Sequence, residues 1–211
     1  MEIIYSDDKL IVCIKPRGAL STDEPGGAPS LLREWLGDAA APIYTVHRLD
    51  AAVGGLMVYA RTRHTAADLE REMLSGDFEK EYVAVVHGRL RDMSGTFEDL
   101  LYRDTNKRMT YIVTEPGKNV KDASLSYVVL GEGRGLTMVS IALHTGRTHQ
   151  IRCQFSGRGL PLWGDRKYGR PGDEGEIALW SSSLRFSHPA TGEDMFFTSE
   201  PPAELPWTYF L

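Results

Sequence analysis

The sequence predicts an α+β fold in which consecutive β-strands make up most of the chain and a few short helices accompany them. Two observations lead to this prediction. Short apolar runs follow one another along the 211 residues, separated by turns that contain Gly, Pro or Asp. Helical periodicity is confined to a few segments, too few to place a helix between each pair of strands, as a wound parallel sheet requires.

In the first half of the chain, predicted elements alternate with loops rich in turn-forming residues. Residues 2–5 and 10–14 are expected to form a hairpin around a polar turn. Residues 21–30 are expected to be an exposed loop, and Ser30 to cap a short helix that ends at Leu36. The other elements predicted in this half are a strand at 44–46, a break at Gly54-Gly55, a strand at 56–60, and a helix at 65–74 with Ala66, Leu69 and Met73 on one face.

The second half of the chain is predicted to be mainly strands. They are expected at residues 81–86, 95–100, 108–113, 123–130, 136–143, 177–186 and 194–198. A short helix is expected at 149–155 and a loop at 160–169. The glycine-rich segment 131–135 has neither Walker nor dinucleotide-binding spacing, so it predicts only the turn of a long hairpin.

The composition indicates a soluble globular protein of one large domain or two small ones, with 42% hydrophobic and 25% charged residues. The net charge of −5 argues only mildly against a nucleic-acid partner, because a local basic face on an acidic body can bind RNA. No signal peptide and no membrane-length apolar run is visible. Cys13 and Cys153 fit neither a disulfide framework nor a zinc pattern, so a reducing cytoplasm is expected.

The first polar cluster that stands between apolar strands is His47-Arg48-Leu49-Asp50. An aspartate before a double glycine can be held by the backbone and exposed at a cleft. The positive charge of Arg48 would favour its ionised form, and an ionised carboxylate is a competent covalent nucleophile. The alternative is a turn aspartate that accepts hydrogen bonds from local N–H groups.

The second cluster is residues 145–152, Thr-Gly-Arg-Thr-His-Gln-Ile-Arg, which follows a strand and opens a helix. Arg147 and Arg152 could each bind a carboxylate or a phosphate bidentately. Residues 135–170, the basic segment, contain six basic residues and one acid, Asp165, with Trp163 and Tyr168 among them. Positive charge with aromatic rings suits RNA backbone binding and base stacking. The alternative is a solvated helix face.

Other catalytic sites are not supported. The six histidines form no HExxH or facial-triad spacing, and no GxSxG is present, so neither a metal site nor an α/β-hydrolase is expected.

Together these segments resemble the RluA family of pseudouridine synthases. The resemblance extends from about residue 3 to residue 200, and its motifs occur in the family's order. They are residues 15–18 (Lys-Pro-Arg-Gly), 47–50 (His-Arg-Leu-Asp) with Gly55-Leu56, 80–88 (Lys-Glu-Tyr-Val-Ala-Val-Val-His-Gly), 145–152 with 159–161, 164–165 and 168–169, and 187–189 (Ser-His-Pro).

Two positions depart from the family pattern. Val53-Gly54 stand where the family usually has Thr-Ser, and Cys153-Gln154 stand where it usually has Val-His. Glycine lacks backbone restriction, so Gly54 is expected to loosen the catalytic loop. Neither change removes a group to which chemistry is assigned.

The resemblance implies a pseudouridine synthase fold, with a long, bent, antiparallel or mixed β-sheet and flanking helices and loops around a central cleft. It implies that Asp50 is the catalytic nucleophile, that Tyr82 stacks on the target base and helps to remove its C5 proton, that Arg152 pairs with the Asp50 carboxylate, and that Arg48 fills the space left by the base. Arg147, His47 and Ile151 are the further residues expected at the substrate-binding site, with Arg147 toward phosphate.

Residues 1–211 are expected to form a single catalytic domain without an additional N-terminal RNA-binding domain. The expected partner is ribosomal RNA or tRNA, in a stem-loop with a flipped uridine, and no membrane, DNA, metal or cofactor is expected. A monomer is predicted. Two alternatives stay open at this point: an RNA-binding module of the same fold without catalysis, and an unrelated small-molecule enzyme that uses the Asp50 cleft.

Overall fold

The strands and helices belong to two units, seen in a computed structural model that describes residues 1–210. Unit 1 consists of Met1–Lys80 and Trp180–Glu200, and unit 2 of Glu81–Leu179 and the segment that begins at Pro201. Each unit is described by itself.

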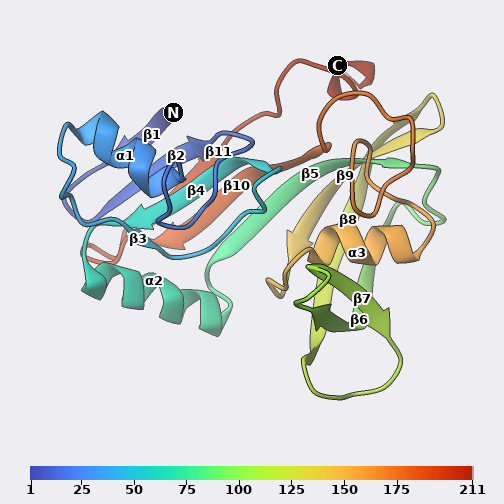
Figure 1. The fold of residues 1–211 in the computed structure, drawn as a ribbon, viewed down its shortest axis with the longest axis horizontal. Helices are drawn as coiled ribbons and strands as arrows, with labels where there is room; N and C mark the ends of the chain where they lie inside the picture. The colour runs from blue at the N-terminus through green and yellow to red at the C-terminus, as the bar shows by residue number, and fades with distance from the viewer. Residues whose placement is uncertain (211) are drawn as a thin grey trace. The chain divides into compact units, whose positions relative to one another are not determined.

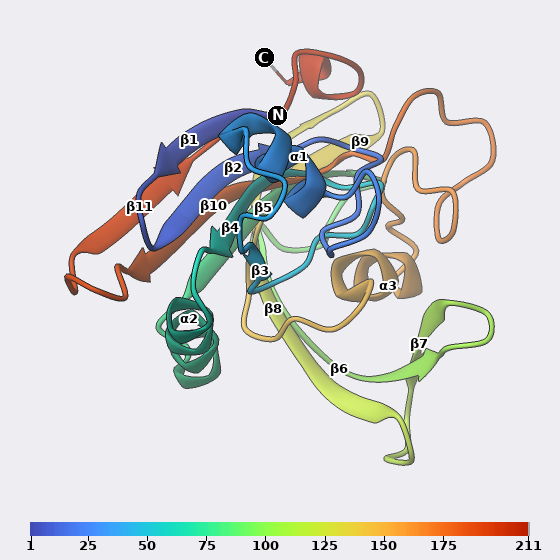
Figure 2. The same cartoon turned by 60° about the vertical axis from the view of Figure 1, so that its left-hand side comes forward.

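Unit 1 contains a mixed set of strands and two helices (Figure 1). The strands are β1 (Glu2–Ser6), β2 (Leu10–Lys15), β3 (Tyr44–Thr45), β4 (Gly54–Ala60), β10 (Leu179–Ser187) and β11 (Asp194–Thr198), and the helices are α1 (Ala28–Leu36) and α2 (Arg63–Ser75). Strand β4 pairs antiparallel with β2 and β3 and parallel with β10, while β1 and β11 pair antiparallel with β2 and β10. Figure 2 brings these strands toward the viewer.

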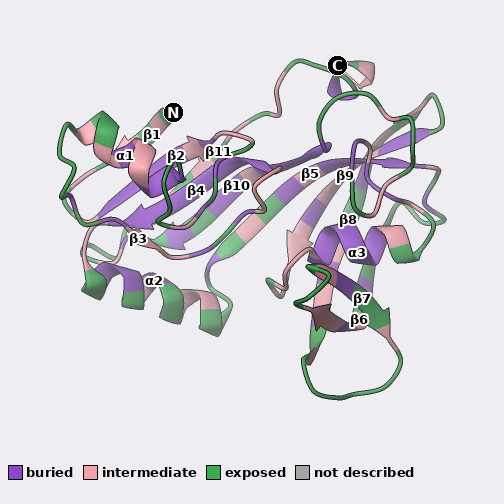
Figure 3. Ribbon diagram, viewed as in Figure 1, coloured by how far each residue is buried: buried purple, intermediate pink, exposed green. Residues whose placement is uncertain are grey.

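The core of unit 1 lies between the β2, β4 and β10 strands and helix α2. The predicted apolar face of α2 is confirmed, because Ala66 and Leu69 are buried and Met73 packs at its edge. Strand β4 is buried along its whole length, which Figure 3 shows in purple. Helix α1 begins earlier than predicted: Gly27 rather than Ser30 is its N-cap, and Pro29 occupies the first turn, where its missing N–H costs nothing.

The predicted break at Gly54-Gly55 is wrong, because both glycines belong to β4. They pair with Trp180 and Ser181 of β10. A Cβ on Gly54 would lie 2.5 Å from the Trp180 ring, and one on Gly55 would lie 2.4 Å from the Ser181 carbonyl oxygen. The glycines therefore allow β10 to approach closely instead of ending a strand.

Unit 2 contains an antiparallel set of strands. They are β5 (Glu79–His87), whose first residues lie in unit 1, β6 (Ser94–Asp104), β7 (Met109–Val113), β8 (Val120–Gly133) and β9 (Leu136–Leu143), in the order β5-β9-β8-β6-β7. The predicted hairpin of β8 and β9 is confirmed, and the segment 131–135 provides its turn. Helix α3 (Gln150–Gly157) lies beside β6 and β7 (Figure 1), and a short 3₁₀ turn is formed at Trp207–Tyr209.

Aromatic rings join α3 to the strands of unit 2. Phe155 of α3 contacts Phe97 of β6 and Tyr127 of β8, with ring centroids 5.1 and 6.2 Å away. Because α3 is fixed in this way, its buried first turn holds the residues of the second predicted cluster in place. Within residues 1–210, no helix is long and apolar enough to cross a membrane.

Candidate active-site residues in the two units

Asp50 of unit 1 lies at the start of an anchored turn. Its carbonyl oxygen accepts the N–H of Val53 at 2.9 Å. The preceding Leu49 is fixed by Ser21, whose Oγ donates to the Leu49 carbonyl at 2.9 Å and accepts the Leu49 N–H at 3.0 Å. The Asp50 side chain is half-buried. The backbone is thus held on both sides of Asp50, as a nucleophile on a loop requires.

Lys15 is a buried cation whose charge acts on Asp50. Its Nζ donates to the carbonyl oxygens of Pro16 at 2.9 Å, Ala19 at 2.8 Å and Ala51 at 3.3 Å. Burial lowers the pKa of Lys15 to about 8, and the negative charge of Asp50 counteracts part of that shift. Arg48, the cation expected for this task, is exposed. Sequence reasoning recognised Lys15 only as part of a motif; the available signal was a lysine that directly follows the fully apolar run of β2.

His47 belongs to the core of unit 1. Its Nε2 accepts the N–H of Val58 at 3.2 Å, and its ring lies 5.8 Å from that of Phe78. Burial and the nearby charge of Lys80 lower the pKa of His47 to about 3, so the imidazole is neutral. These contacts describe a residue that ties the Asp50 segment to β4, and its predicted part in substrate binding stays a prediction.

Unit 2 contains Tyr82, Ile151 and Arg152, all of which are buried. Tyr82 lies on β5 opposite Ile141 of β9, and Ile151 and Arg152 lie in the first turn of α3. The predicted pairing of Arg152 with Asp50 would join the two units, and it stays a prediction.

Arg152 has a carboxylate partner that was not predicted. Its Nε donates to Oδ2 of Asp165 at 2.8 Å, and its Nη2 donates to Oδ1 at 2.6 Å. Burial alone would raise the pKa of Asp165, but the hydrogen bonds and charge of Arg152, with the N–H groups of Lys167 and Tyr168, lower it below its ordinary value. The pair uses two of the five guanidinium N–H groups, so it does not preclude a second carboxylate partner.

The segment before α3 is tied to strand β8. Gln150 accepts hydrogen bonds from the Thr145 hydroxyl and the Arg147 N–H through Oε1, and its Nε2 donates to the Ser124 carbonyl. Arg147 is half-buried, and its Nε donates to the carbonyl oxygen of Asp122 at 2.7 Å. This arrangement presents the Arg147 guanidinium at the surface of unit 2.

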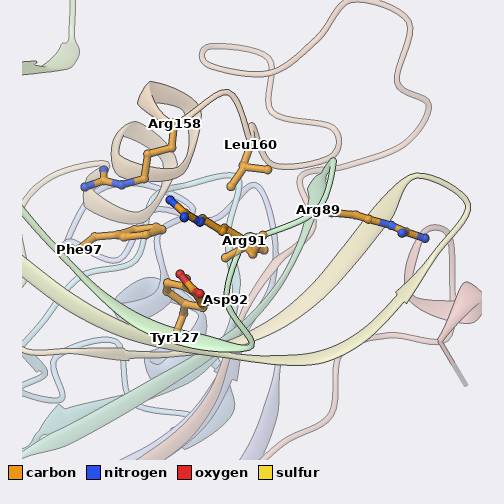
Figure 4. Close-up of a pocket in the computed structure, with 8 residues that line it drawn as sticks. Arg89, Arg91, Asp92, Phe97, Tyr127, Arg158 and Leu160 are labelled. Atoms are coloured by element: carbon orange, nitrogen blue, oxygen red, sulfur yellow. The ribbon is translucent and has the colours of Figure 1, made fainter.

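A cavity of about 330 Å³ lies beside α3, lined by Arg89, Leu90, Arg91, Asp92, Phe97, Tyr127, Arg158 and Leu160. Figure 4 shows Arg91 directed toward Phe97 and Arg158, and Arg89 directed away from them. Arg158 pairs with Asp99 at 2.8 Å, and Arg89 approaches Glu132 at 3.4 Å. Because carboxylates pair with two of the three arginines and Asp92 also lines the cavity, it does not by itself indicate an anion-binding site. Among residues 1–210, no three His, Cys, Asp or Glu side chains are grouped as metal ligands would be.

Comparison with known proteins identifies the family. Residues 9–157, which include Asp50, Tyr82 and Arg152, match the sequence profile of the RNA pseudouridylate synthases. The chain belongs to this family. It is an RNA pseudouridine synthase of the RluA-like type, an isomerase that acts on uridines in RNA.

Two relatives of the synthase illustrate the similarity. YlyB of Bacillus subtilis, named an uncharacterized RNA pseudouridine synthase, is 32% identical over 216 residues, which cover 97% of this chain and 70% of the relative. Ribosomal large subunit pseudouridine synthase D of Vibrio parahaemolyticus is 34% identical over 228 residues, which cover 97% of this chain and 68% of the relative.

Solved structures confirm the predicted α+β fold. The synthase superposes on human RNA pseudouridylate synthase domain containing 1 with a TM-score of 0.81 at 23% identity, covering 98% of this chain and 85% of the other. Human RNA pseudouridylate synthase domain containing 4 gives a TM-score of 0.79 at 21% identity, covering 99% and 90%. The mixed β-sheet strands with three helices are therefore the pseudouridine synthase fold.

Proposed function

We propose that Asp50 is the nucleophile with which this synthase converts uridine to pseudouridine in structured RNA. The observation that carries the proposal is the anchored turn on which Asp50 stands, beside the buried Lys15 ammonium. The ionised carboxylate is the reactive form of this nucleophile, and its negative charge interacts favourably with the Lys15 ammonium.

In the proposed reaction, Asp50 attacks the uracil ring or the ribose of a flipped uridine. The bond between N1 and C1′ breaks, the uracil turns, and a bond forms between C5 and C1′, while the covalent bond to Asp50 breaks and returns the free carboxylate. C5 loses its proton and N1 gains one, so the product is an isomer and the atoms balance without a redox cofactor, ATP or a metal.

Flipping the target base out of the RNA costs a few kcal/mol. Stacking on Tyr82 is proposed to return roughly 1–3 kcal/mol of that cost.

The other candidate residues receive supporting roles. Arg152 is proposed to pair with the Asp50 carboxylate, and exposed Arg48 to fill the space that the flipped base leaves. Arg147 is proposed to bind phosphate. His47 and Ile151 are buried, so we propose that they shape the site by holding its backbone.

The proposed substrate is ribosomal RNA or tRNA. The names of the Vibrio relatives make ribosomal RNA of the large subunit the first substrate to test. We further propose that residues 1–211 act as one catalytic domain and as a monomer, and that the protein works in the reducing cytoplasm. Its two cysteines are buried free thiols, and burial raises the pKa of Cys13 to about 12 and that of Cys153 to about 11.

The proposal is tested with Asp50→Asn. The variant should fold and bind RNA but form no pseudouridine, because an amide cannot act as the nucleophile. Asp8→Asn is the matched control, since Asp8 is an exposed carboxylate of the same unit, and it should keep wild-type turnover. Mapping pseudouridines in total RNA with and without the gene identifies the target position. Wild-type turnover by Asp50→Asn would rule out the assignment.

A further inference from the structure

We infer that Asp165 is a positioning residue of the synthase, which holds the guanidinium of Arg152 in the orientation that the isomerisation uses. The inference rests on the proposed role of Arg152. It assigns a function to the single acidic residue of the basic segment, for which the sequence indicated none.

The contact between the two side chains fixes the guanidinium plane. Both hydrogen bonds are short and lie along one edge of the guanidinium, and the side chains of Arg152 and Asp165 are 6% and 0% exposed. An unrestrained arginine side chain carries about 2 kcal/mol of rotamer entropy. A bidentate pair removes that freedom before the substrate arrives, which is preorganisation.

The Asp165 carboxylate is itself held by the backbone. Its Oδ1 accepts the N–H groups of Lys167 at 2.9 Å and Tyr168 at 3.1 Å. The Asp165 carbonyl accepts the N–H of Gly169 at 2.8 Å, and a Cβ on Gly169 would lie 2.2 Å from that oxygen. Only glycine therefore fits the turn that aims this carboxylate.

Tyr168 supports the guanidinium from a second direction. The centroid of its ring lies 5.2 Å from Cζ of Arg152, within the range of a cation–π contact. The Tyr168 hydroxyl accepts the Thr110 N–H at 2.7 Å and lies 2.8 Å from Nδ1 of His149. One loop thus supplies both a carboxylate and an aromatic ring to the same guanidinium.

That loop is anchored to strand β5. Trp163 donates its N–H to the carbonyl of Val85 at 2.9 Å and accepts the N–H of Ala178 at its own carbonyl. Farther along the same loop, Oδ2 of Asp173 accepts the N–H of Gly164 and lies 2.8 Å from Nε2 of His87. The loop that carries Asp165 is therefore held in place by hydrogen bonds to strand β5.

Stability alone gives no reason for this pair. Desolvation of two charges offsets much of their attraction, and apolar side chains of similar volume often stabilise a core equally well. A buried, fully oriented ion pair that includes a proposed site residue is better explained by a need for a fixed positive charge.

The first test compares turnover in Asp165→Asn and Asp165→Glu. Asparagine keeps the size but removes the charge, while glutamate keeps the charge but displaces it. Both should lower kcat by roughly 10- to 100-fold, because a misplacement of about 1 Å can cost 100-fold, and KM for RNA should change little. Asp99→Asn is the control, since Asp99 also forms two hydrogen bonds with an arginine of this region, the exposed Arg158 at the C-terminal end of α3, and its kcat should stay within about twofold of wild type.

The second test separates positioning from a general structural defect. In Arg152→Ala, added guanidinium ion should restore part of kcat, and it should do so only while Asp165 is intact to hold the ion. Asp165→Glu should add little further loss to Arg152→Ala, since both changes remove one function. Asp165→Glu retains the charge, so it carries this test even where Asp165→Asn fails to fold.

The outcomes separate the inference from the proposed function. Wild-type kcat in Arg152→Ala would remove the proposed role of Arg152 itself. A slow Arg152→Ala with a fully active Asp165→Glu would overturn the inference alone. Multiplicative losses in the double variant, with guanidinium rescue that does not depend on Asp165, would also overturn it, because they would show that Asp165 acts on the fold rather than through Arg152.

Discussion

A lysine ammonium has three N–H donors, and Lys15 directs its ammonium to three backbone carbonyls. Two of them, on Pro16 and Ala19, belong to the segment that follows β2, and the third, on Ala51, directly follows Asp50. The cost of burying the charge is offset by these hydrogen bonds and by the charge of Asp50. Lys15 therefore both joins two loops of unit 1 and supplies positive charge to the proposed nucleophile.

This arrangement predicts an alkaline limit on the rate. The pKa of Lys15 is lowered to about 8, so above that pH the charge beside Asp50 is lost and kcat/KM should fall. Lys15→Arg keeps its charge throughout this range, so in that variant the decline should move to higher pH. Lys15→Met should abolish the decline and hold the rate, at every pH, near the low value that the wild type reaches once Lys15 is deprotonated. The measurement is single-turnover kinetics between pH 6 and about 10, the range in which this group titrates.

Stability should change in the opposite direction to activity. Between the folded pKa of about 8 and the ordinary value of 10.5, the unfolded chain holds a proton that the folded chain has released. The contribution of Lys15 to the free energy of unfolding therefore rises with pH in this window. A rate decline caused by unfolding would contradict the assignment, as would a decline that is unchanged in both Lys15 variants.

At the scale of elements, strand β4 approaches β10 so closely that two consecutive side chains are excluded. Gly54 stands where the family usually has serine, and the prediction that it loosens the loop treated glycine only as a flexible residue. In the structure, the Trp180 ring occupies the space that a Cβ on Gly54 would need. The centroid of this ring lies 5.9 Å from Cζ of Arg17. The departure from the family pattern is thus matched by a large aromatic residue on the neighbouring strand.

This match can be tested with Gly54→Ser, the residue the family usually has. The substitution should reduce the free energy of unfolding by about 1–3 kcal/mol, as overpacking does. In a Trp180→Leu background the same substitution should cost less, with a coupling of about 0.5–3 kcal/mol. Urea unfolding measures both, and Gly133→Ser is the control, since a Cβ at Gly133 meets nothing within 4 Å. Equal costs in the two backgrounds would show that Trp180 is not the cause.

The elements that the sequence predicted correctly are those with a strong local pattern. Strand β11 has the predicted bounds, and helix α2 buries the predicted face because its apolar residues recur at helical spacing. The start of α1 and the path through Gly54-Gly55 were wrong, because glycine and proline mark turns in most sequences but here serve a cap and a close strand contact. Such roles depend on a partner strand that local patterns do not reveal.

For the candidate site, too, some residues could be predicted from the sequence and others could not. The resemblance to the family named Asp50, Tyr82 and Arg152, and those assignments stay predictions. The partners of such residues could not be named in advance, since Lys15 acts through backbone carbonyls of distant loops and Asp165 reaches Arg152 only because a loop returns along β5. Even so, Asp165 was visible as the one acid in the basic segment.

At the scale of the whole molecule, the distribution of charge matters more than the net charge of −5. The basic segment, residues 135–170, contains six cations, but two of them are paired with carboxylates: buried Arg152 with Asp165, and the more exposed Arg158 with Asp99. A carboxylate next to a cation cancels much of its charge, so a paired cation neutralises phosphate less and contributes less to the release of counterions from RNA. The segment therefore offers less positive charge to RNA than its composition indicates.

This reduced charge leads to a specific salt dependence of RNA binding. Affinity should fall steeply with salt, because each phosphate that the protein neutralises contributes about 0.7–0.9 to the slope of log K against log salt. Arg166 and Arg170 are exposed, so Arg166→Ala and Arg170→Ala should each reduce that slope by up to about 1. The double variant Arg158→Ala/Asp99→Asn removes an ion pair at constant net charge, so it should leave the slope nearly unchanged. Fluorescence anisotropy with a labelled RNA stem-loop across a range of salt concentrations gives the slopes of the wild type and the three variants.

Two outcomes would contradict this prediction: an affinity that does not depend on salt, or a double variant that loses as much slope as Arg166→Ala and Arg170→Ala do. Either would show that the exposed arginines of this segment do not form the RNA-binding face.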